Sequence, residues 1–267
     1  MKLGPLRSLL HSLYESWVGG NSRVETDSLN PSVSPEGYVE VSRESVAKEL
    51  SCTWQDPAVP QRQYEDCVRS AISSYKAGGA YEPFDVLVAI LFETVPDLAG
   101  MSILEVGCSS GYYFEVFKIK GVQAKYSGCD WSESFIGLAR RNHPEVEFQV
   151  QDARCLTYAD ASFDIVISGG CLPCILEYEE AIAETARVAR HYVVLHRTPV
   201  FYRKKTSYYL RTAYGLQMFE IRFNERELFR LLRKYGLAVV DAVTFEGTYE
   251  RTSGDFWGCK TYLCRKV

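Results

Sequence analysis

The most constraining feature of this sequence is the stretch of residues 101–113, MSILEVGCSSGYY. Residues 103–106 have strand-type character, a five-residue segment with glycine at both ends follows, and an aromatic, helix-compatible run begins at once. A tight glycine turn between a strand and a helix directs backbone N–H groups and the positive end of the helix at an anion above it. The stretch therefore predicts an α/β fold with a ligand cradle at one strand end.

The spacing of the glycines discriminates between cofactors. The dinucleotide pattern G-x-G-x-x-G, counted from Gly107, would need glycine at positions 109 and 112, where Ser109 and Tyr112 stand. The observed pattern resembles motif I of the class I S-adenosylmethionine (SAM) methyltransferases, acidic-x-G-x-G-x-G, with Ser109 in place of the middle glycine. Taken alone, the motif could also be an ordinary strand–helix turn. The resemblance implies SAM contacts from five residues: Glu105, Gly107, Cys108, Ser109 and Gly111.

A second strand is expected over residues 125–130, and it ends in a carboxylate. Asp130 could accept hydrogen bonds from both hydroxyls of a ribose, which is the role of the acidic residue at this place in nucleotide-binding α/β folds. Trp131 follows directly, and the resemblance implies that it covers the adenine face. Packing in the core is the alternative for this tryptophan.

Two further strands carry matching residues at their ends. Residues 146–150 alternate as a strand does, and they are followed by Asp152 and Ala153, which match the family's contacts to the adenine amino group and ring edge. Residues 162–169 form a buried-strand run that closes on small residues, and we expect Ser168 to lie beside the sulfonium. Four matches in the right order make the resemblance specific.

The predicted fold class is α/β. The resemblance implies the class I methyltransferase fold: a seven-stranded, mostly parallel sheet with an antiparallel last strand and helices on both faces. After the fourth strand, the sequence predicts helices and strands in the alternation that such a sheet needs. Helices are expected over residues 177–189 and 224–235, and strands over 192–196, 237–245 and 260–264, with a loop over 247–258 between the last two.

The domain prediction divides the chain near residue 98. Residues 1–98 are expected to form a helical N-terminal extension or lid with a linker near 19–37, and residues 99–267 the SAM-binding domain. Helical segments are predicted over residues 42–50, 60–77 and 84–95. Trp54-Gln55-Asp56-Pro57, with Gln61 and Gln63, resembles the lid of sugar- and small-molecule-modifying methyltransferases. Helices that merely cover one face of the sheet are the alternative.

An apolar stripe at helical spacing occupies residues 2–18. It favours a short helix docked on the domain, and an interfacial membrane helix is the alternative. The segment is too short and too polar to span a bilayer, and the longest uninterrupted apolar run elsewhere covers only residues 86–92.

Composition excludes several classes of function. With 30 basic against 34 acidic residues and a net charge of −4, the chain has no overall positive electrostatic field that would attract nucleic acid.

Nine cysteines without paired spacing and no recognisable signal peptide predict reduced thiols and a cytoplasmic location. Cys171 and Cys174 have C-x-x-C spacing, but no second pair or histidine cluster accompanies them, so no metal is predicted. A nucleophilic Cys174, as in cytosine-5 methyltransferases, would need a target-recognition region and a basic surface, and neither is visible.

The acceptor site is predicted in an excursion over residues 199–223, just after the fifth strand. It is rich in tyrosines, which could stack on a ring, and Arg203, Lys204 and Arg211 could bind a phosphate or carboxylate. A solvated basic face over core aromatics is the alternative.

His196, at the end of the fifth strand, is the predicted general base, because imidazole titrates near neutral pH. A structural histidine, or one that contacts only the cofactor, is the alternative.

These features predict a SAM-dependent methyltransferase that acts on a small molecule. Resemblance to glycan-pathway members of the family favours a hydroxyl of a sugar or nucleotide-sugar as the acceptor. A natural-product phenol or carboxylate is the alternative acceptor, and a non-catalytic SAM-binding regulatory protein is the alternative function.

Overall fold

The computed structural model describes residues 37–46, 48–250 and 255–267. The predicted helix over residues 2–18 and nearly all of the predicted linker lie outside the described residues.

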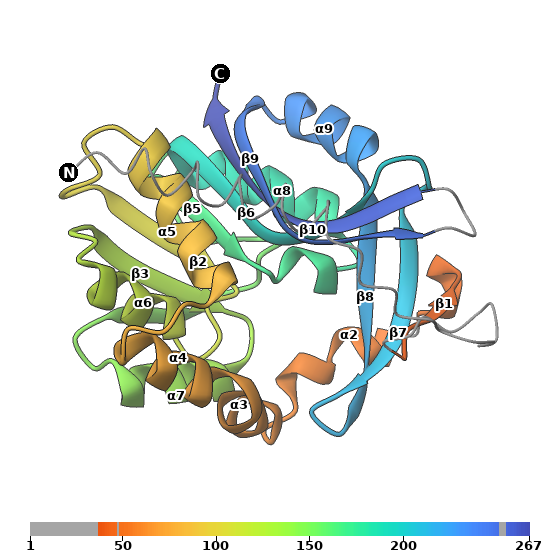
Figure 1. Ribbon diagram of the computed structural model, residues 1–267, viewed down its shortest axis with the longest axis horizontal. Helices are drawn as coiled ribbons and strands as arrows, with labels where there is room; N and C mark the ends of the chain where they lie inside the picture. The colour runs from red at the N-terminus through yellow and green to blue at the C-terminus, as the bar shows by residue number, and fades with distance from the viewer. Residues whose placement is uncertain (1–36, 47, 251–254) are drawn as a thin grey trace.

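Seven strands form the central sheet of the molecule (Figure 1). They lie side by side in the order β4-β3-β2-β5-β6-β10-β9, and β10 runs antiparallel to both of its neighbours while the pairs from β4 to β6 are parallel. Their bounds are β2 (Ser102–Val106), β3 (Lys125–Asp130), β4 (Glu147–Val150), β5 (Phe163–Gly169), β6 (Ala189–Phe201), β9 (Leu237–Glu250) and β10 (Asp255–Lys266). The prediction of a mostly parallel seven-stranded sheet with an antiparallel last strand is confirmed.

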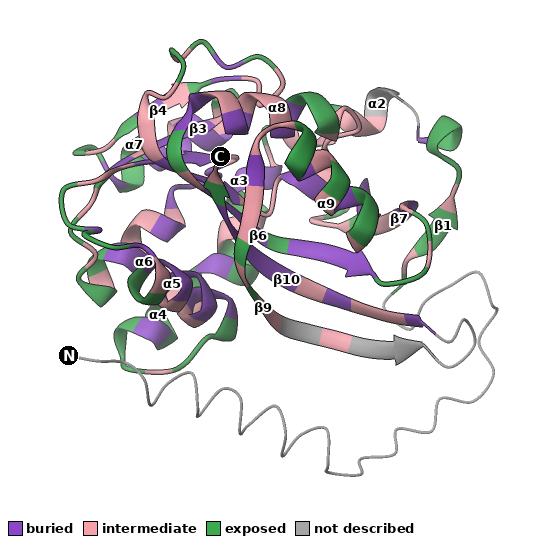
Figure 2. Cartoon of the chain, turned by 90° about the horizontal axis from the view of Figure 1, so that it is seen from above, coloured by how far each residue is buried: buried purple, intermediate pink, exposed green. Residues whose placement is uncertain are grey.

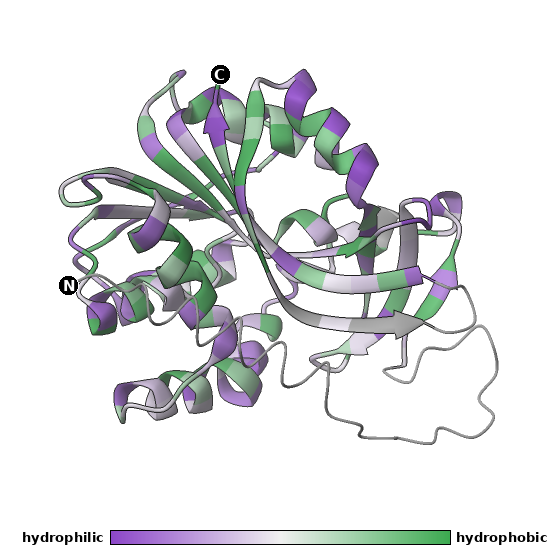
Figure 3. Ribbon diagram, turned by 45° about the horizontal axis from the view of Figure 1, so that its top comes forward, coloured by the Kyte–Doolittle hydropathy of each residue, from purple (hydrophilic) through white to green (hydrophobic). Residues whose placement is uncertain are grey.

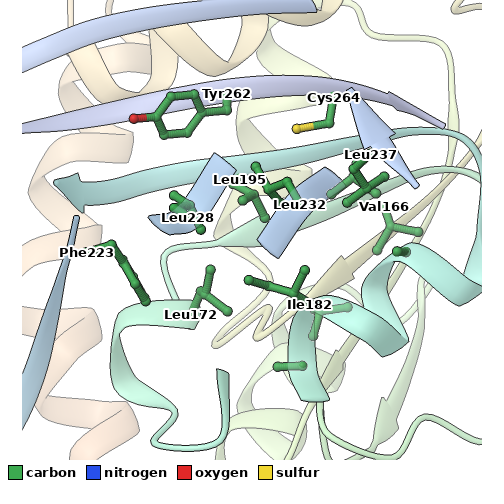
Figure 4. Close-up of a cluster of buried hydrophobic side chains, with 14 of the residues drawn as sticks. Val166, Leu172, Ile182, Leu195, Phe223, Leu228, Leu232, Leu237, Tyr262 and Cys264 are labelled. Carbon is green, nitrogen blue, oxygen red and sulfur yellow. The ribbon is translucent and has the colours of Figure 1, made fainter. Parts of the chain in front are cut away.

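Helices cover both faces of this sheet because its central strands are apolar on both sides. Successive side chains of a strand point to opposite faces, so Val194 packs in one core cluster while Val193 and Leu195 pack in the other. One face carries α5 (Glu82–Thr94), α6 (Tyr112–Lys120) and α7 (Glu133–Asn142). The other carries α8 (Tyr178–Val188) and α9 (Glu225–Lys234), whose Ile182, Leu228 and Leu232 meet the sheet in Figure 4.

Amphipathic patterning explains how these helices dock. In α9, apolar and charged residues alternate as bands in Figure 3, and the buried side of the helix in Figure 2 faces the sheet while its exposed side faces solvent. Asn224 begins this helix by accepting a hydrogen bond from the backbone N–H of Glu227, 3.0 Å away. The predicted boundaries of this helix are therefore confirmed within one or two residues.

The excursion after the fifth strand is itself a small sheet. β7 (Ser207–Ala213) and β8 (Leu216–Asn224) form an antiparallel hairpin, and β1 (Val39–Val41) pairs with β7. β8 pairs with β6 through Val200 and Phe201, beyond the end of β5, so the three strands on the right in Figure 1 extend the central sheet to ten strands.

Two predicted strand ends were wrong for a common reason. The fifth strand does not end at His196, and most of the predicted loop over residues 247–258 is strand. Thr198 to Phe201 of β6 pair with residues 257–260 of β10, and β10 pairs with β9 on its other side. Each strand continues because a distant strand satisfies its backbone groups, and such a partner cannot be read from local sequence.

The described part of the N-terminal segment is helical but irregular. η1 (Arg43–Ser45), α2 (Lys48–Ser51) and η2 (Thr53–Gln55) replace the single helix predicted over residues 42–50. A continuous helical run follows, formed by α3 (Val59–Gln63), the π-helical turn η3 (Tyr64–Val68) and α4 (Arg69–Lys76), where one helix was predicted over residues 60–77. Single π turns within helices are frequent near functional sites. The helix predicted over residues 84–95 is confirmed as α5.

Candidate active site

A cavity of about 500 Å³ lies at the carboxyl ends of the central strands, bounded by the turn after β2 and the hairpin β7–β8. Carboxyl strand ends are the usual ligand site of open α/β sheets, and this volume suits a small-molecule site. Of the predicted SAM-contact residues, six line the cavity: Gly107, Ser109, Asp130, Trp131, Asp152 and Ala153. Trp54 and Gln63 of the predicted lid also line it.

The turn after β2 depends on left-handed backbone at two glycines. Gly107 has φ 73°, and a Cβ there would lie 2.7 Å from the sulfur of Cys171. Gly111 has φ 76° and begins helix α6. Ser109 also has a positive φ, 53°, which is uncommon for a residue with a side chain. Its hydroxyl donates a hydrogen bond to Oε1 of Gln63, so the N-terminal helical segment contacts the turn directly.

Asp130 is held by backbone donors on two sides. Its Oδ2 accepts from the N–H of Ser109 at 3.0 Å and its Oδ1 from the N–H of Ser132 at 3.0 Å. Burial raises the pKa of this carboxyl to about 6, and the backbone hydrogen bonds oppose that rise. Each carboxylate oxygen can accept a further hydrogen bond, so the group is oriented toward the cavity and still able to bind a diol.

Asp152 is engaged by a cation that the sequence analysis did not single out. Nε of Arg154 lies 3.0 Å from Oδ1 and Nη2 lies 2.7 Å from Oδ2, and this pairing lowers the pKa of Asp152. Nη1 of the same guanidinium lies 2.9 Å from Glu177, and its centre lies 5.9 Å from the ring of Trp131. Arg154 therefore ties together the end of β4, the start of α8 and Trp131 on one side of the cavity.

Four predicted SAM-contact residues support the site from beneath instead of lining it. Glu105 is 1% exposed, accepts a hydrogen bond from the hydroxyl of Tyr126, and has its pKa raised to about 8 by burial. Ser168 lies 3.3 Å from the sulfur of Cys171. Cys108 packs under the turn, and Gly111 starts α6.

His196 is not brought to the cavity. It is 1% exposed, its Nε2 lies 2.8 Å from the hydroxyl of Tyr113, and its Nδ1 lies 2.7 Å from Oγ1 of Thr261. Burial and the charge of Arg197 keep the pKa of the imidazole well below its usual value. The expectation that this side chain emerges at the carboxyl edge is corrected, because β6 passes through His196 and continues to Phe201.

The hairpin end of the cavity is aromatic and cationic. Tyr214 lies 6.0 Å from Trp54, ring centre to ring centre, and Arg62 of α3 donates to the carbonyl of Tyr214 at 2.7 Å. Arg211, Arg222 and Glu220 of the hairpin line this end, whereas Arg197 lines the cavity next to Gly170, where its Cβ lies 3.6 Å from the position of an added Cβ. Of the basic residues predicted to meet the acceptor, Arg211 lines the cavity, whereas Lys204 pairs with Glu40 and Arg203 is exposed outside the cavity.

Several lining residues were not predicted. Arg197, Tyr38 and Trp257 reach the cavity through pairings between distant segments, whereas Arg154 lies two residues after the predicted Asp152 and pairs with it. Cys171 and Cys174 also line it, and the structure describes all nine cysteines as free thiols. Within the described residues, His, Cys, Asp and Glu side chains form no group of three or more suited to a metal ion. No described helix has the length and apolarity needed to cross a membrane.

Comparison with known proteins agrees with this geometry. Residues 103–191 match a family described as "Methyltransferase domain". Among curated proteins, the chain is 32% identical over 99 residues to a phthiotriol/phenolphthiotriol dimycocerosates methyltransferase of Mycobacterium tuberculosis, covering 36% of this chain and 37% of that protein. It is 27% identical over 141 residues to a demethylmenaquinone methyltransferase of Lactococcus lactis, covering 49% and 56%. The chain thus matches only about a third to a half of the length of these relatives.

Solved structures share the fold at low identity. A SAM-dependent methyltransferase from Methanosarcina mazei superposes with TM-score 0.53 and 19% identity, over 67% of this chain and 97% of that one. The Burkholderia thailandensis 1,6-didemethyltoxoflavin-N1-methyltransferase superposes with TM-score 0.51 and 18% identity, over 86% and 95%. Together, the strand order and these neighbours show that the chain has the class I methyltransferase fold, and residues 103–191 match a methyltransferase domain.

Proposed function

We propose that this protein transfers a methyl group from SAM to a small-molecule acceptor. The observation that carries the proposal is the single cavity that joins two sets of residues. Residues at one end match the cofactor contacts of class I methyltransferases, and residues at the other end come from a hairpin and an N-terminal segment outside the matched region. A cavity with two chemically different ends suits a two-substrate transfer.

At the cofactor end, each assignment rests on a group that faces the cavity. Asp130 is the acceptor for the ribose hydroxyls, because its oxygens are oriented and retain free lone pairs. Trp131 would hold the adenine face, and Asp152 with Ala153 would border its edge, since all three line the cavity. Gly107 and Ser109 line the cavity at the turn, where the amino-acid part of SAM would lie. Glu105, Cys108, Gly111 and Ser168 fix the shape of the turn and of the wall behind it.

When bound, SAM would supply an electrophilic methyl carbon for in-line displacement by the acceptor. The chain's own task is to align the acceptor, exclude water and accept a proton where the acceptor is a hydroxyl. Trp54 and Gln63 lie over the cavity between the turn and the hairpin, so residues 37–98 act as its lid in this proposal, and residues 199–223 provide the acceptor wall.

The proposal for the acceptor has a general part, a small molecule, and a specific part, a sugar or nucleotide-sugar hydroxyl. A small molecule is supported by the volume of the cavity and by the named activities of the matched relatives. The sugar or nucleotide-sugar hydroxyl stays a hypothesis based on sequence resemblance, beside a phenol or a carboxylate. Trp54, Tyr214 and Trp257 offer flat surfaces to either a sugar or an aromatic ring.

The test is to measure S-adenosylhomocysteine release from SAM across a panel of sugars, nucleotide-sugars, phenols and carboxylates. The proposal predicts turnover that depends on at least one acceptor class. Tight SAM binding without turnover on any acceptor would instead favour a non-catalytic SAM-binding protein, and failure to bind SAM would contradict both functions.

A further inference from the structure

A β-bulge in β6 directs Arg197 into the cavity. Lys260 pairs with Thr198 and Tyr262 with Leu195, so His196 and Arg197 together stand opposite the single residue Thr261. Arg197 has φ 54°, a left-handed conformation that is strained for a residue with a side chain. Bulges near active sites re-aim a side chain in this way. While His196 stays buried, Arg197 is exposed and lines the cavity.

Arg197 has no counter-ion in the part of the chain that the structure describes. No hydrogen bond, ion pair or ring contact joins its guanidinium to another described residue. By contrast, Arg154 at the cofactor end of the same cavity binds two carboxylates. A cationic side chain held toward a cavity by a strained bulge, with no partner of its own, is a site for an anion.

A second cation lines the same cavity from strand β7. Nε of Arg211 is buried and makes no hydrogen bond within the described residues, and the nearest glutamate oxygen, on Glu220, is 3.9 Å away. Glu220 is already engaged, because the hydroxyl of Tyr38 donates to it at 3.0 Å and Nε of Arg222 lies 3.3 Å from it. Glu220 therefore compensates only part of the positive charge around it.

Arg222 packs among aromatic rings of the protein and is not a group that binds the anion. It is 4% exposed, and its guanidinium is enclosed by the rings of Tyr38, Tyr209 and Trp257 at 4.4 to 4.7 Å. Arg197 and Arg211 are the two cations of this cavity that can still bind an anion. Both line the same cavity, as Cys174 does.

We propose that the acceptor carries a carboxylate or phosphate group and that Arg197 and Arg211, which line the same cavity, bind it there. The inference rests on the proposed methyl transfer and narrows its substrate class. Guanidinium groups match both oxyanions by paired N–H donors, so the shared chemistry is an oxyanion on a ring or chain small enough to lie between Trp54 and the cofactor end.

The binding arm of the test does not need turnover. Benzoate, phenyl phosphate and the neutral analogue benzamide are titrated calorimetrically into the protein saturated with S-adenosylhomocysteine. The wild type should bind one or both anions at least about tenfold more tightly than benzamide, the range expected for hydrogen bonds to charged groups. Arg197→Met and Arg211→Met should each lose that preference, and Arg211→Lys should recover part of it.

Arg203→Met is the matched control, because Arg203 belongs to the same excursion, is exposed and does not line the cavity. It should bind like the wild type. Affinity for S-adenosylhomocysteine should stay within about twofold in every variant, which separates loss of the anion site from misfolding. Equal binding of benzamide and both anions by the wild type, or unchanged anion binding in both methionine variants, overturns the proposal.

The turnover arm compares acidic and neutral partners within the acceptor panel, such as 4-hydroxybenzoate with its methyl ester and glucose 6-phosphate with glucose. Acidic acceptors should be preferred, and Arg197→Met should lower their kcat/KM by about 10- to 100-fold, mainly through KM. Turnover with no preference for acids overturns the anion site but leaves methyl transfer intact. Anion binding without any turnover retains the anion site and contradicts the proposed function.

Discussion

At the scale of single residues, the two buried carboxyls of the site have opposite tasks. Asp130 faces the cavity with its oxygens oriented by backbone N–H groups, whereas Glu105 lies behind the turn and is bonded to Tyr126. Both residues were predicted as cofactor contacts from the sequence. A sequence motif gives the position of a residue in a strand but not the direction of its side chain. Only the pairing of β2 with its neighbours determines which face each side chain takes.

Asp130→Ala should weaken SAM binding by about 1.5–3 kcal/mol, because a charged acceptor of hydrogen bonds is lost. Isothermal titration calorimetry measures the change in Kd directly. Glu133→Ala is the control, since Glu133 is exposed on α7 and does not line the cavity. A Kd for Asp130→Ala that equals that of the wild type would remove Asp130 from the ribose site.

Glu105→Gln should change how stability depends on pH. Burial raises the pKa of Glu105 from 4.5 to about 8, so the protonated carboxyl stabilises the fold at low pH, and this contribution is lost as the pH rises through 8. The neutral variant has no such loss. Its free energy of unfolding relative to the wild type should rise by up to about 1.4 kcal/mol per pH unit between pH 4.5 and 8. Urea unfolding at pH 5.5 and 8.5 measures the free energy of unfolding of the variant minus that of the wild type, and a value that is constant or lower at pH 8.5 would refute the assignment.

At the scale of elements, local sequence predicts the helices and strands that depend on nearby residues. The prediction fails where pairing with a distant strand determines how far a strand extends. The order of strands and helices, the start of α9 and the extent of α5 follow from hydrophobic period and capping residues. The extension of β6 to Phe201 follows from pairing with β10 and β8, more than 20 residues away in sequence. Because of this extension, His196 lies in the middle of a strand and Arg197 lies on a bulge. The pairing of β6 with β10 therefore explains both why His196 is buried and why Arg197 lines the cavity.

His196→Asn should cost stability more than turnover. The variant leaves the hydroxyl of Tyr113 without the imidazole that lies 2.8 Å away, which should lower the free energy of unfolding by about 1–3 kcal/mol. At saturating SAM and acceptor, kcat per folded protein should stay within about threefold of the wild type. A loss of 10²–10⁴, the range for a missing general base, would show that His196 reaches the acceptor after all.

At the scale of the whole molecule, the cavity is closed by segments from both ends of the described chain. β1 and the helical run from Val59 approach from the N-terminal side, the hairpin β7–β8 from the middle, and Trp257 with Cys259 from β10 (Figure 1). A methyltransferase sheet was predictable from its four ordered matches. The hairpin end was predictable only in part: Arg211 and Tyr214 belong to the predicted excursion, whereas Tyr38 and Trp257 come from distant segments.

The most direct test of the central claim is to follow the methyl group itself. The protein is incubated with SAM that carries a trideuterated methyl and with the acceptor panel, and products are analysed by mass spectrometry. Transfer predicts one acceptor heavier by a CD₃ group in place of hydrogen, formed in amounts equal to S-adenosylhomocysteine and strongly reduced in Asp130→Ala at limiting SAM. S-adenosylhomocysteine without a labelled acceptor, or bound SAM that remains intact with every acceptor, would contradict methyl transfer by this cavity.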